Sequence, residues 1–533
     1  MAVSSPGLFP NMLYIRNITI HLMVKIVFKK DKSNQLLLLP PDLGSLIPEN
    51  HIVRTVDEVI NQIRLHPLLE TYKGGGTSSY SPRMLLKVVT YAYIEKIYTT
   101  RRIEKALREN INFMWISGMS TPDHSTIHNF RSKRLKEAVE DVFSSVVEVL
   151  ISTGYVKAEN LFIDGTKIEA NANKYSYVWK KNVERHTTVI KKKVKDLLAH
   201  IDELQKEEEA EYGSANLEEL EGDITSEDIE KVVEEINQKL AKGSKSREAS
   251  AGVKKLKNDY IPKLRKYEQQ RGMLEGRNSC SKTDREATFF RMKEDPMGSG
   301  QLKPGYNVQI ATEDQFILGY GVYQKAADTS VFIPFLEKVR GQIQYLAVNV
   351  VADAGYGSEE NYEYVTDNGL GNYVKYQDFD YERTKEYKNR TFLSSNFKYR
   401  PRKDQYTCPE GDILYYVNTQ EVISESGYRA ERRVYQSKTC SSCPSRQLCC
   451  KGNGNRTIQV SPKLIQYRLT ARQNLESEEG VKLRIKRCID VESVFGQIKH
   501  NGQFRRFYTR GLKNVSTEWG IMSIAHNIKK MAN

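Results

Sequence analysis

The sequence lacks any long apolar run. No hydrophobic stretch reaches the roughly 18–20 residues that a membrane span needs, and a conspicuous one, Leu36 to Leu39, ends at two prolines. The N-terminus does not fit a secretory signal either, because Arg16 and His21 interrupt its apolar part and no small-residue cleavage site comes after it. We therefore expect a cytoplasmic protein with no membrane partner.

Cysteine is scarce, with seven among 533 residues. In a cytoplasmic chain, cysteines serve as thiols or metal ligands rather than as disulfides. The sequence also has no Ser–His–Asp pattern, no Walker loop and no dinucleotide-binding fingerprint. None of these patterns competes with a site built from carboxylates.

Acidic residues are too few to balance the basic ones. The chain has 81 Lys and Arg against 67 Asp and Glu, a net charge of +14. Such an excess favours a polyanionic partner. Nucleic acid, the ribosome and anionic membranes all qualify, and charge does not choose among them.

Residues 1–22 differ in character from the rest of the chain, so we expect a non-native leader there, with either Met1 or Met23 as the true start. Helical spacing then predicts a helical domain over residues 23–150, with a joint at Gly74–Gly76. Its last part, a break at Gly118–Pro122 followed by a basic helix, has the outline of a helix-turn-helix DNA-binding unit. A merely solvated basic face is the alternative. The candidate DNA contacts are His128, Arg131, Lys133 and Arg134.

Two predicted strands end in an aspartate. The first covers Leu161 to Ile163 and is followed by Asp164 and Gly165, where we expect the chain to turn. A plain Asp-Gly turn is the alternative explanation for this pair. The second strand, residues 345–353, is nearly continuously apolar, which is typical of a strand buried on both faces, and it ends in Asp353.

A helix over residues 484–499 supplies a third acid. Its apolar residues recur at three- and four-residue steps, and Glu492 lies within that pattern. Lys499 comes seven residues later and so shares a face with Glu492. An exposed Glu–Lys pair is the alternative. The residues of the apolar stripe are Ile485, Ile489, Val491, Val494, Phe495 and Ile498.

Between these elements lie a hairpin over residues 301–324, with a turn at Glu313–Asp314, and further helices and a strand. The order predicts a ribonuclease-H-like α/β core with a mixed sheet, in which Asp164 and Asp353 lie side by side at the carboxyl ends of parallel strands. The core is made of residues 151–179, 280–379 and 476–533. Two inserts interrupt it: a helical or coiled-coil arm over residues 180–279, which either dimerises or is a solvated linker, and a Cys-rich segment over residues 380–475.

The Cys-rich insert resembles a zinc ribbon or knuckle. A CxxC pair is followed by a further cysteine, and one more precedes it, which suits a structural Zn²⁺ site. Unligated thiols and redox chemistry are the alternatives. Cys280 and Cys488 stand alone and are expected to be packing residues. The candidate zinc ligands are Cys408, Cys440, Cys443 and Cys449.

Basic residues alternate with Phe504, Phe507 and Tyr508 near the C-terminus, a pattern that fits contact with a single strand or a distorted duplex. A solvated basic turn over a small aromatic cluster is the alternative. With two arginines beside Glu492, the candidate DNA contacts here are Arg484, Arg487, Arg505, Arg506 and Arg510.

Three carboxylates that converge from distant positions can hold two Mg²⁺ or Mn²⁺ ions. Such a pair activates a water or a 3′-hydroxyl and stabilises the leaving oxygen in phosphoryl transfer. We expect Asp164 to bridge the two ions, Asp353 and Glu492 to take one side each, and Lys499 to lie near the phosphate of the bound strand.

Long stretches resemble the DDE transposases of bacterial insertion sequences, from about Pro48 onward. They are ALRENINFMWISG, PDHSTIHNFR, FIDGTKIEANANKY, MKEDPMGSGQLKPGYNVQIAT, VADAGYGSEENYEYV and DVESVFGQIKHNGQFRRFYTRG. The family's signature around the last acid is Y-x2-R-x3-E-x6-K. Glu492 and Lys499 match it, whereas Ile485 and Cys488 occupy the Tyr and Arg positions.

The resemblance implies that Asp164, Asp353 and Glu492 cut DNA at terminal inverted repeats and join the ends to target DNA. It implies DNA as partner, a homodimer or larger assembly in the synaptic complex, and association with the nucleoid. A catalytically inactive or domesticated DNA-binding descendant, and a related nuclease that cuts without joining, are the alternatives.

Overall fold

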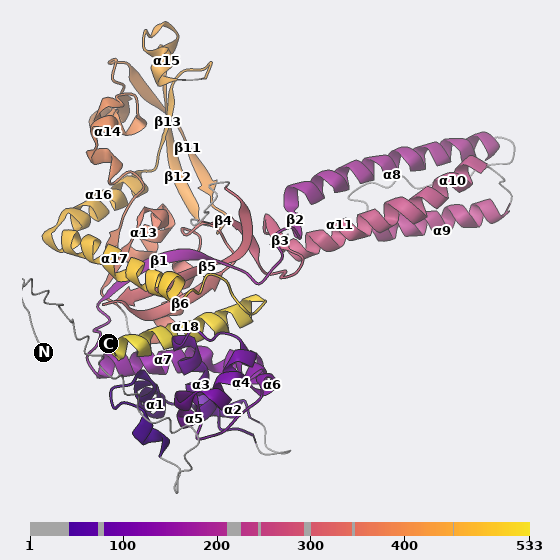
Figure 1. Cartoon of the computed structure of the whole chain (residues 1–533). Coiled ribbons are helices and arrows are strands. Elements are labelled where there is room, and N and C mark those ends of the chain that lie inside the picture. Colours follow the sequence, from indigo (N-terminus) through magenta and orange to yellow (C-terminus); the bar gives the residue numbers. More distant parts are fainter. Residues whose placement is uncertain are drawn as a thin grey trace, which may run out of the picture. The chain divides into compact units, whose positions relative to one another are not determined.

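The computed structural model describes residues 42–72, 79–209, 225–242, 247–292, 300–343, 347–450 and 452–532 (Figure 1). Contacts divide the chain into two units, Met1–Leu46 and Ile47–Asn533. Of the first unit, the description covers residues 42–46, with the 3-10 helix η1 (Leu43–Leu46). The predicted leader, the start at Met23 and the joint at Gly74–Gly76 lie outside the described residues. The elements from α1 onward all belong to the second unit.

The N-terminal part of this second unit is helical, as its spacing predicts. Side chains at the helix starts satisfy the free backbone N–H groups: Asp123, for example, accepts a bond from the Thr126 N–H at 2.7 Å. The basic helix predicted after the break at Gly118–Pro122 is present, but it continues through a π-helical turn into the next helix. The elements are α1 (Ile52–Gln62), α2 (His66–Glu70), α3 (Pro82–Ile94), α4 (Thr100–Glu109), α5 (Ile111–Ile116), α6 (His124–Asn129), η2 (Phe130–Leu135) and α7 (Lys136–Ser152).

A mixed sheet lies at the centre of the unit. Its order is β4-β5-β1-β7-β8, and β6 also pairs with β5. β1 runs antiparallel to β5 and parallel to β7, which in turn is parallel to β8. The strands are β1 (Asn160–Glu169), β4 (Thr288–Arg291), β5 (Leu302–Glu313), β6 (Phe316–Tyr323), β7 (Asn349–Ala352) and β8 (Gly371–Val374).

The predicted hairpin is confirmed as β5 and β6. Its turn, however, is one residue later than expected, at Asp314 and Gln315, which both have positive φ (51° and 62°). Two positive φ values at the turn suit the twist of a tight hairpin. Glu313 thereby stays in the strand, and its carboxylate points inward, where it is 3% exposed.

The expected turn at Gly165 was wrong. β1 continues through Asp164 and Gly165 to Glu169, because its antiparallel pairing with β5 runs on after the parallel pairing with β7 ends at Ile163 and Ala352. Gly165 instead allows the Gln309 side chain to lie close to the β1 backbone: a Cβ at position 165 would be 2.1 Å from Nε2 of Gln309. Glycine is the residue that this contact permits.

Helices cover both faces of the sheet. Successive side chains of a strand point to opposite faces. Lys486 of α17 lies over Phe162 of β1, whereas Leu161 lines a cavity with residues of α12. The helical elements that follow β6 in the chain and lie outside the second insert are α12 (Phe332–Ile343), the 3-10 turn η4 (Ala354–Tyr356), α13 (Glu359–Asp367), α16 (Pro462–Glu476), α17 (Glu478–Gly496), the π-helical turn η9 (Gln497–Asn501) and α18 (Leu512–Met531).

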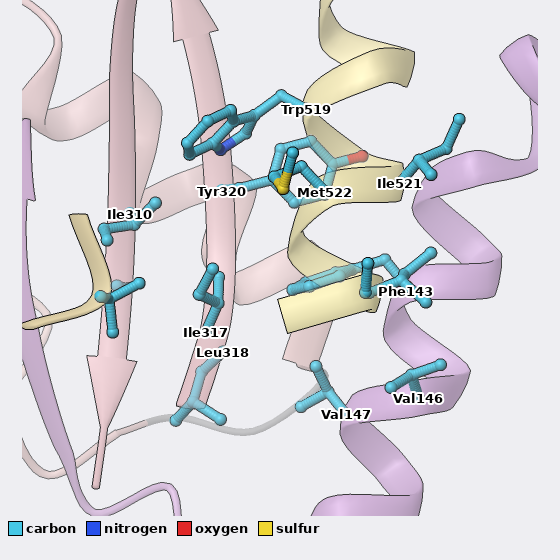
Figure 2. Packing of buried hydrophobic residues seen from close by; sticks show 14 of the residues in the cluster. Phe143, Val146, Val147, Ile310, Ile317, Leu318, Tyr320, Trp519, Ile521 and Met522 are labelled. Atoms are coloured by element: carbon cyan, nitrogen blue, oxygen red, sulfur yellow. The ribbon is translucent and has the colours of Figure 1, made fainter. Parts of the chain in front are cut away.

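The last helix joins the N-terminal helices to the sheet. α18 contacts α3, α7 and β6, and Figure 2 shows Tyr320 of β6 beside Trp519 and Met522 of α18 and close to Phe143 of α7. The Phe143 and Tyr320 rings are 4.9 Å apart and nearly perpendicular. One continuous apolar core therefore extends from Ile47 to Ile528.

The helices expected over residues 180–277 are present and have a small core of their own, built on residues such as Val194, Ile236 and Leu264. A two-stranded sheet joins the two ends of the arm. Gly243 and Ser244, which the sequence predicts near the tip or joint of the arm, lie outside the described residues. The elements are β2 (Tyr177–Trp179), α8 (Lys180–Glu209), α9 (Ser226–Lys242), α10 (Arg247–Lys255), the π-helical turn η3 (Leu256–Tyr260), α11 (Ile261–Leu274) and β3 (Ser279–Ser281).

The second insert contains an antiparallel sheet in the order β13-β12-β11-β10-β9. Phe397, Tyr406, Leu414, Tyr435 and Ile458 form its small core, against which Cys408 and Cys449 pack. Its elements are η5 (Tyr381–Arg383), α14 (Lys385–Asn389), η6 (Ser394–Asn396), β9 (Lys398–Arg400), η7 (Pro401–Lys403), β10 (Gln405–Thr407), β11 (Ile413–Ile423), β12 (Arg429–Ser437), η8 (Cys440–Ser442), α15 (Arg446–Cys449) and β13 (Thr457–Val460).

Candidate functional site

Asp164 and Asp353 lie next to each other because their strands are parallel neighbours. Ile163 pairs with Ala352, and each aspartate is the next residue along its own strand direction. Each carboxylate is steadied by a local backbone bond. Oδ1 of Asp164 accepts from the Gly165 N–H at 2.8 Å, and Oδ1 of Asp353 accepts from the Gly355 N–H at 2.9 Å.

The guanidinium of Arg487 pairs with both carboxylates. Nη2 of Arg487, on α17, is 3.3 Å from Oδ2 of Asp353 and 4.0 Å from Oδ2 of Asp164. Arg487 is 8% exposed. Two neighbouring carboxylates repel each other, and a shared cation stabilises their charged forms. The predicted convergence of Asp164 and Asp353 is therefore present, with a guanidinium between them.

Glu492 is not brought to this pair. It is exposed, and within the described residues its side chain has no hydrogen bond or ion pair. On α17 it lies five residues after Arg487, which turns it about 140° away around the helix axis. In the part of the chain that the structure describes, no three His, Cys, Asp or Glu side chains are grouped to hold a metal ion.

Lys499 does lie beside β1. Its Nζ donates to Oγ1 of Thr166 at 2.5 Å. Thr166 is two residues after Asp164, so both side chains leave β1 on the same face. A cation thus lies beyond the first aspartate along the strand, on the same face of the sheet.

The predicted stripe on this helix was partly wrong. Ile485 and Ile489 are 62% and 58% exposed, while the polar residues Arg487 and Asp490 are buried. Asp490 accepts a bond from the Gln315 N–H at 2.6 Å, and burial raises its pKa. Partners from distant parts of the chain thus place two charged side chains on the inner face, and the two isoleucines face outward.

A polar network that the sequence did not reveal supports the site from the opposite face of β1. Asp328 accepts bonds from the side-chain amides of Asn307 and Gln309, and the Tyr356 hydroxyl donates to Gln309. Burial, and then the charges of Asp164, Asp328 and Asp353, raise the pKa of Tyr356. The hydroxyl therefore stays protonated and acts as a donor.

Five cysteines of the second insert line one cavity, although no three of them form a group that could hold a metal ion in this conformation of the described residues. Cys408, Cys440, Cys443, Cys449 and Cys450 all line it, although three separate segments carry them. All are free thiols, and burial raises the pKa of Cys449. Cys280 is buried, as expected of a packing residue, whereas Cys488 is exposed, so that expectation was wrong for Cys488.

The candidate DNA contacts of the N-terminal part divide into two groups. His128 and Lys133 are exposed. Arg131 is buried and donates to the Tyr93 hydroxyl and the Tyr98 carbonyl at 3.2 and 2.9 Å. Arg134 donates to the Thr71 carbonyl. The two arginines thus hold helices together within the protein.

The C-terminal candidates also have partners in the protein. Arg484 donates to the Leu475 carbonyl at 3.1 Å. Arg506 and Arg510 donate to carbonyls of residues 170–172, and Arg505 contacts His500. Phe504 and Phe507 are buried against Trp519, so they form the small aromatic cluster of the alternative explanation. All three arginines from 505 to 510 remain exposed.

Two family models match the chain. The family described as Transposase domain (DUF772) matches residues 41–133, and the family described as Transposase DDE domain matches residues 407–532. The two matches point to a DDE transposase of insertion-sequence type. None of the curated proteins matches it.

The DDE match includes Glu492, Lys499 and the five cysteines of the second insert, and the other match ends within η2. Asp164 and Asp353 lie between the two matched regions, so their assignment depends on the sheet. Among the helices that the structure describes, none has the length and hydrophobicity of a membrane span.

Proposed function

We propose that the transposase cleaves DNA at terminal inverted repeats and transfers the ends to target DNA, with Asp164, Asp353 and Glu492 as its catalytic carboxylates. The observation that carries this proposal is the pairing of Asp164 and Asp353 on one cation at the carboxyl ends of adjacent parallel strands. The strand order supports a ribonuclease-H-like core, since β1 lies between antiparallel β5 and parallel β7.

The donor set suits a hard divalent cation, because the two Oδ2 atoms already share one positive charge and carboxylate oxygens are the ligands that Mg²⁺ prefers. Asp164 and Asp353 would hold the ions, two per site, and we propose Glu492 as the third ligand, although in this conformation it faces away from the pair. When bound, Mg²⁺ or Mn²⁺ would activate a water or a 3′-hydroxyl and stabilise the leaving 3′-oxygen. Lys499, held at Thr166, is placed to contact the phosphate of the bound strand.

We propose that DNA is contacted by the helical domain, which the sequence predicts over residues 23–150, and by the basic segment after η9. Exposed His128, Lys133 and Arg505 are its clearest members, and the net charge of +14 favours such a partner. We assign residues 151–179, 280–379 and 476–533 to the catalytic core and the two inserts to the arm and the Cys-rich part. Synapsis of two element ends requires a homodimer or larger assembly.

Zinc is the metal proposed for the cysteine cavity, with Cys408, Cys440, Cys443 and Cys449 as ligands. Thiolates are the usual ligands of structural Zn²⁺, and these four side chains line one cavity from three segments. The metal content of the purified protein tests this. We expect one zinc per chain in the wild type and in the exposed-thiol control Cys488→Ser, and a loss of zinc in Cys440→Ser. A zinc-free wild type would refute the site.

Strand cleavage and joining with labelled end DNA and Mg²⁺ test the main proposal. Asp164→Asn, Asp353→Asn and Glu492→Gln keep side-chain shape and remove charge, and Asp141→Asn, exposed on α7, is the matched control. Loss of an outer partner of a metal ligand costs about 10–100-fold, so each site variant should lose at least about 100-fold in cleavage while it retains DNA binding. Cleavage without joining would indicate a nuclease, and binding without cleavage by the wild type would indicate an inactive descendant.

A further inference from the structure

Arg487 occupies an unusual position for an arginine. It lies on the inner face of α17 with Val491 and Val494, and its Nε has no hydrogen-bond partner among the described residues. A buried charge is tolerated only where it is paired. The pairing here is with Asp164 and Asp353, and both contacts are made by the single atom Nη2.

The contacts separate the oxygens of each aspartate into two roles. The Oδ1 atoms of Asp164 and Asp353 accept backbone N–H bonds from Gly165 and Gly355. The Oδ2 atoms of both face Arg487. A divalent cation that both carboxylates bind must approach these Oδ2 atoms. The guanidinium and the metal therefore compete for the same two oxygens.

We infer that Arg487 is a built-in counter-ion that holds Asp164 and Asp353 together before metal binds and is displaced when metal enters. This inference rests on the proposed function, because it concerns the same two carboxylates. Arg487 acts as a positioning residue: its charge cancels the repulsion that would otherwise separate the aspartates, and its competition lowers the apparent affinity for metal.

The displaced guanidinium needs a new partner, and a DNA phosphate is the anion that the proposed reaction brings to this place. Arginine binds phosphate oxygens in a forked geometry. DNA that takes up Arg487 would free the Oδ2 atoms, so DNA and metal binding would strengthen each other by the same factor. Metal loading is thereby linked to the presence of DNA.

Titration of metal-free, full-length protein with Mn²⁺ tests the competition without any turnover. Arg487→Gln keeps length and polarity and removes the charge. Arg484→Gln, on the same helix but bonded to the Leu475 carbonyl, is the matched control. We expect Arg487→Gln to bind Mn²⁺ at least about tenfold more tightly than the wild type, a change of about 1.4 kcal/mol, and the control to match the wild type. In the metal-free state Arg487→Gln should melt at a lower temperature, and Mn²⁺ should raise its Tm more than that of the wild type.

Arg487→Lys covers the case in which the glutamine variant fails to fold. It keeps the charge but loses the planar fork, so its Mn²⁺ affinity should lie above that of the wild type. Equal or weaker Mn²⁺ binding by a folded Arg487 variant would overturn the inference. Asp164→Asn separates this failure from failure of the proposed function. If Asp164→Asn leaves Mn²⁺ binding unchanged, the metal site itself is wrong; if it abolishes binding while Arg487 variants change nothing, only the counter-ion role is wrong.

Discussion

Replacing Glu313 by glutamine should loosen the start of β1, the strand that carries Asp164. The Glu313 carboxylate accepts four backbone N–H bonds: Oε1 from Glu159 and Asn160 at 3.0 and 2.9 Å, and Oε2 from Lys157 and Ala158 at 2.8 and 2.6 Å. Ala158 has a φ of 57°, which is unfavourable for alanine. The carboxylate compensates for that strain by satisfying the whole turn.

The expected loss is set by these four bonds. In Glu313→Gln an NH₂ group replaces one carboxylate oxygen. The two backbone N–H groups that donated to that oxygen lose their acceptor, and the other two now donate to a neutral oxygen. A hydrogen bond to a charged group is worth about 1.5–3 kcal/mol. Two lost bonds therefore give about 3–6 kcal/mol of local destabilisation.

Hydrogen exchange followed by mass spectrometry measures this loss directly. Peptides that cover residues 157–163 should exchange at least about 100-fold faster in Glu313→Gln, because about 3 kcal/mol corresponds to that factor. Exposed Glu159→Gln is the matched control and should exchange like the wild type. Unchanged protection of residues 157–160 in Glu313→Gln would show that the carboxylate does not hold this turn.

Two further changes probe the packing around the sheet. Burial lowers the pKa of His526 from 6.5 to about 4, so the unfolded chain binds a proton at a higher pH than the folded chain does. The free energy of unfolding is therefore unaffected by protonation of His526 above pH 6.5 and decreases as the pH falls from 6.5 toward 4. His526→Gln keeps a donor for the Gln315 carbonyl but does not titrate, so its Tm should fall less than the wild-type Tm over that pH range. The difference in unfolding free energy across the range is about 3 kcal/mol. Parallel Tm curves for the two proteins would contradict the lowered pKa of His526. Gly165→Ala should lower the free energy of unfolding by about 1–3 kcal/mol, because the new Cβ would collide with Gln309. At Gly341, on α12, a Cβ would meet open space, so Gly341→Ala should be neutral or stabilising in thermal melts. Equal melting temperatures for the two glycine variants would refute the steric argument.

The sequence predicted those parts of the fold in which buried residues follow a regular local spacing. The alternating residues of β5 and β6 and the apolar run of β7 each point to one kind of strand. Asp353 could be placed at the end of β7 for the same reason. Asp164 was found by the same pattern, but the continuation of β1 beyond it depends on pairing with β5, more than a hundred residues away.

The polar residues of the core could not be found in this way. Periodicity treats a charged residue as exposed, so Arg487 and Arg131 were predicted to contact DNA, and Asp490 was not singled out. Their burial depends on partners in other elements: the two aspartates, the Gln315 amide and Tyr93. Buried charged residues could be predicted from a sequence only if the partners that they contact in other elements were already known. The same limit explains why Glu492 was expected beside the aspartates, although α17 turns it outward.

The place of α18 has a consequence for biosynthesis. Arg131 and Glu518, both buried, are linked through the Tyr93 hydroxyl, and Trp519 and Met522 fill the space between the first helices and the sheet. The ribosome makes α18 long after α3 and α7, so these two helices cannot complete their packing until α18 has emerged. A premature stop before Leu512 would yield a chain with its apolar helices uncovered, fit for proteolysis rather than for binding DNA on its own.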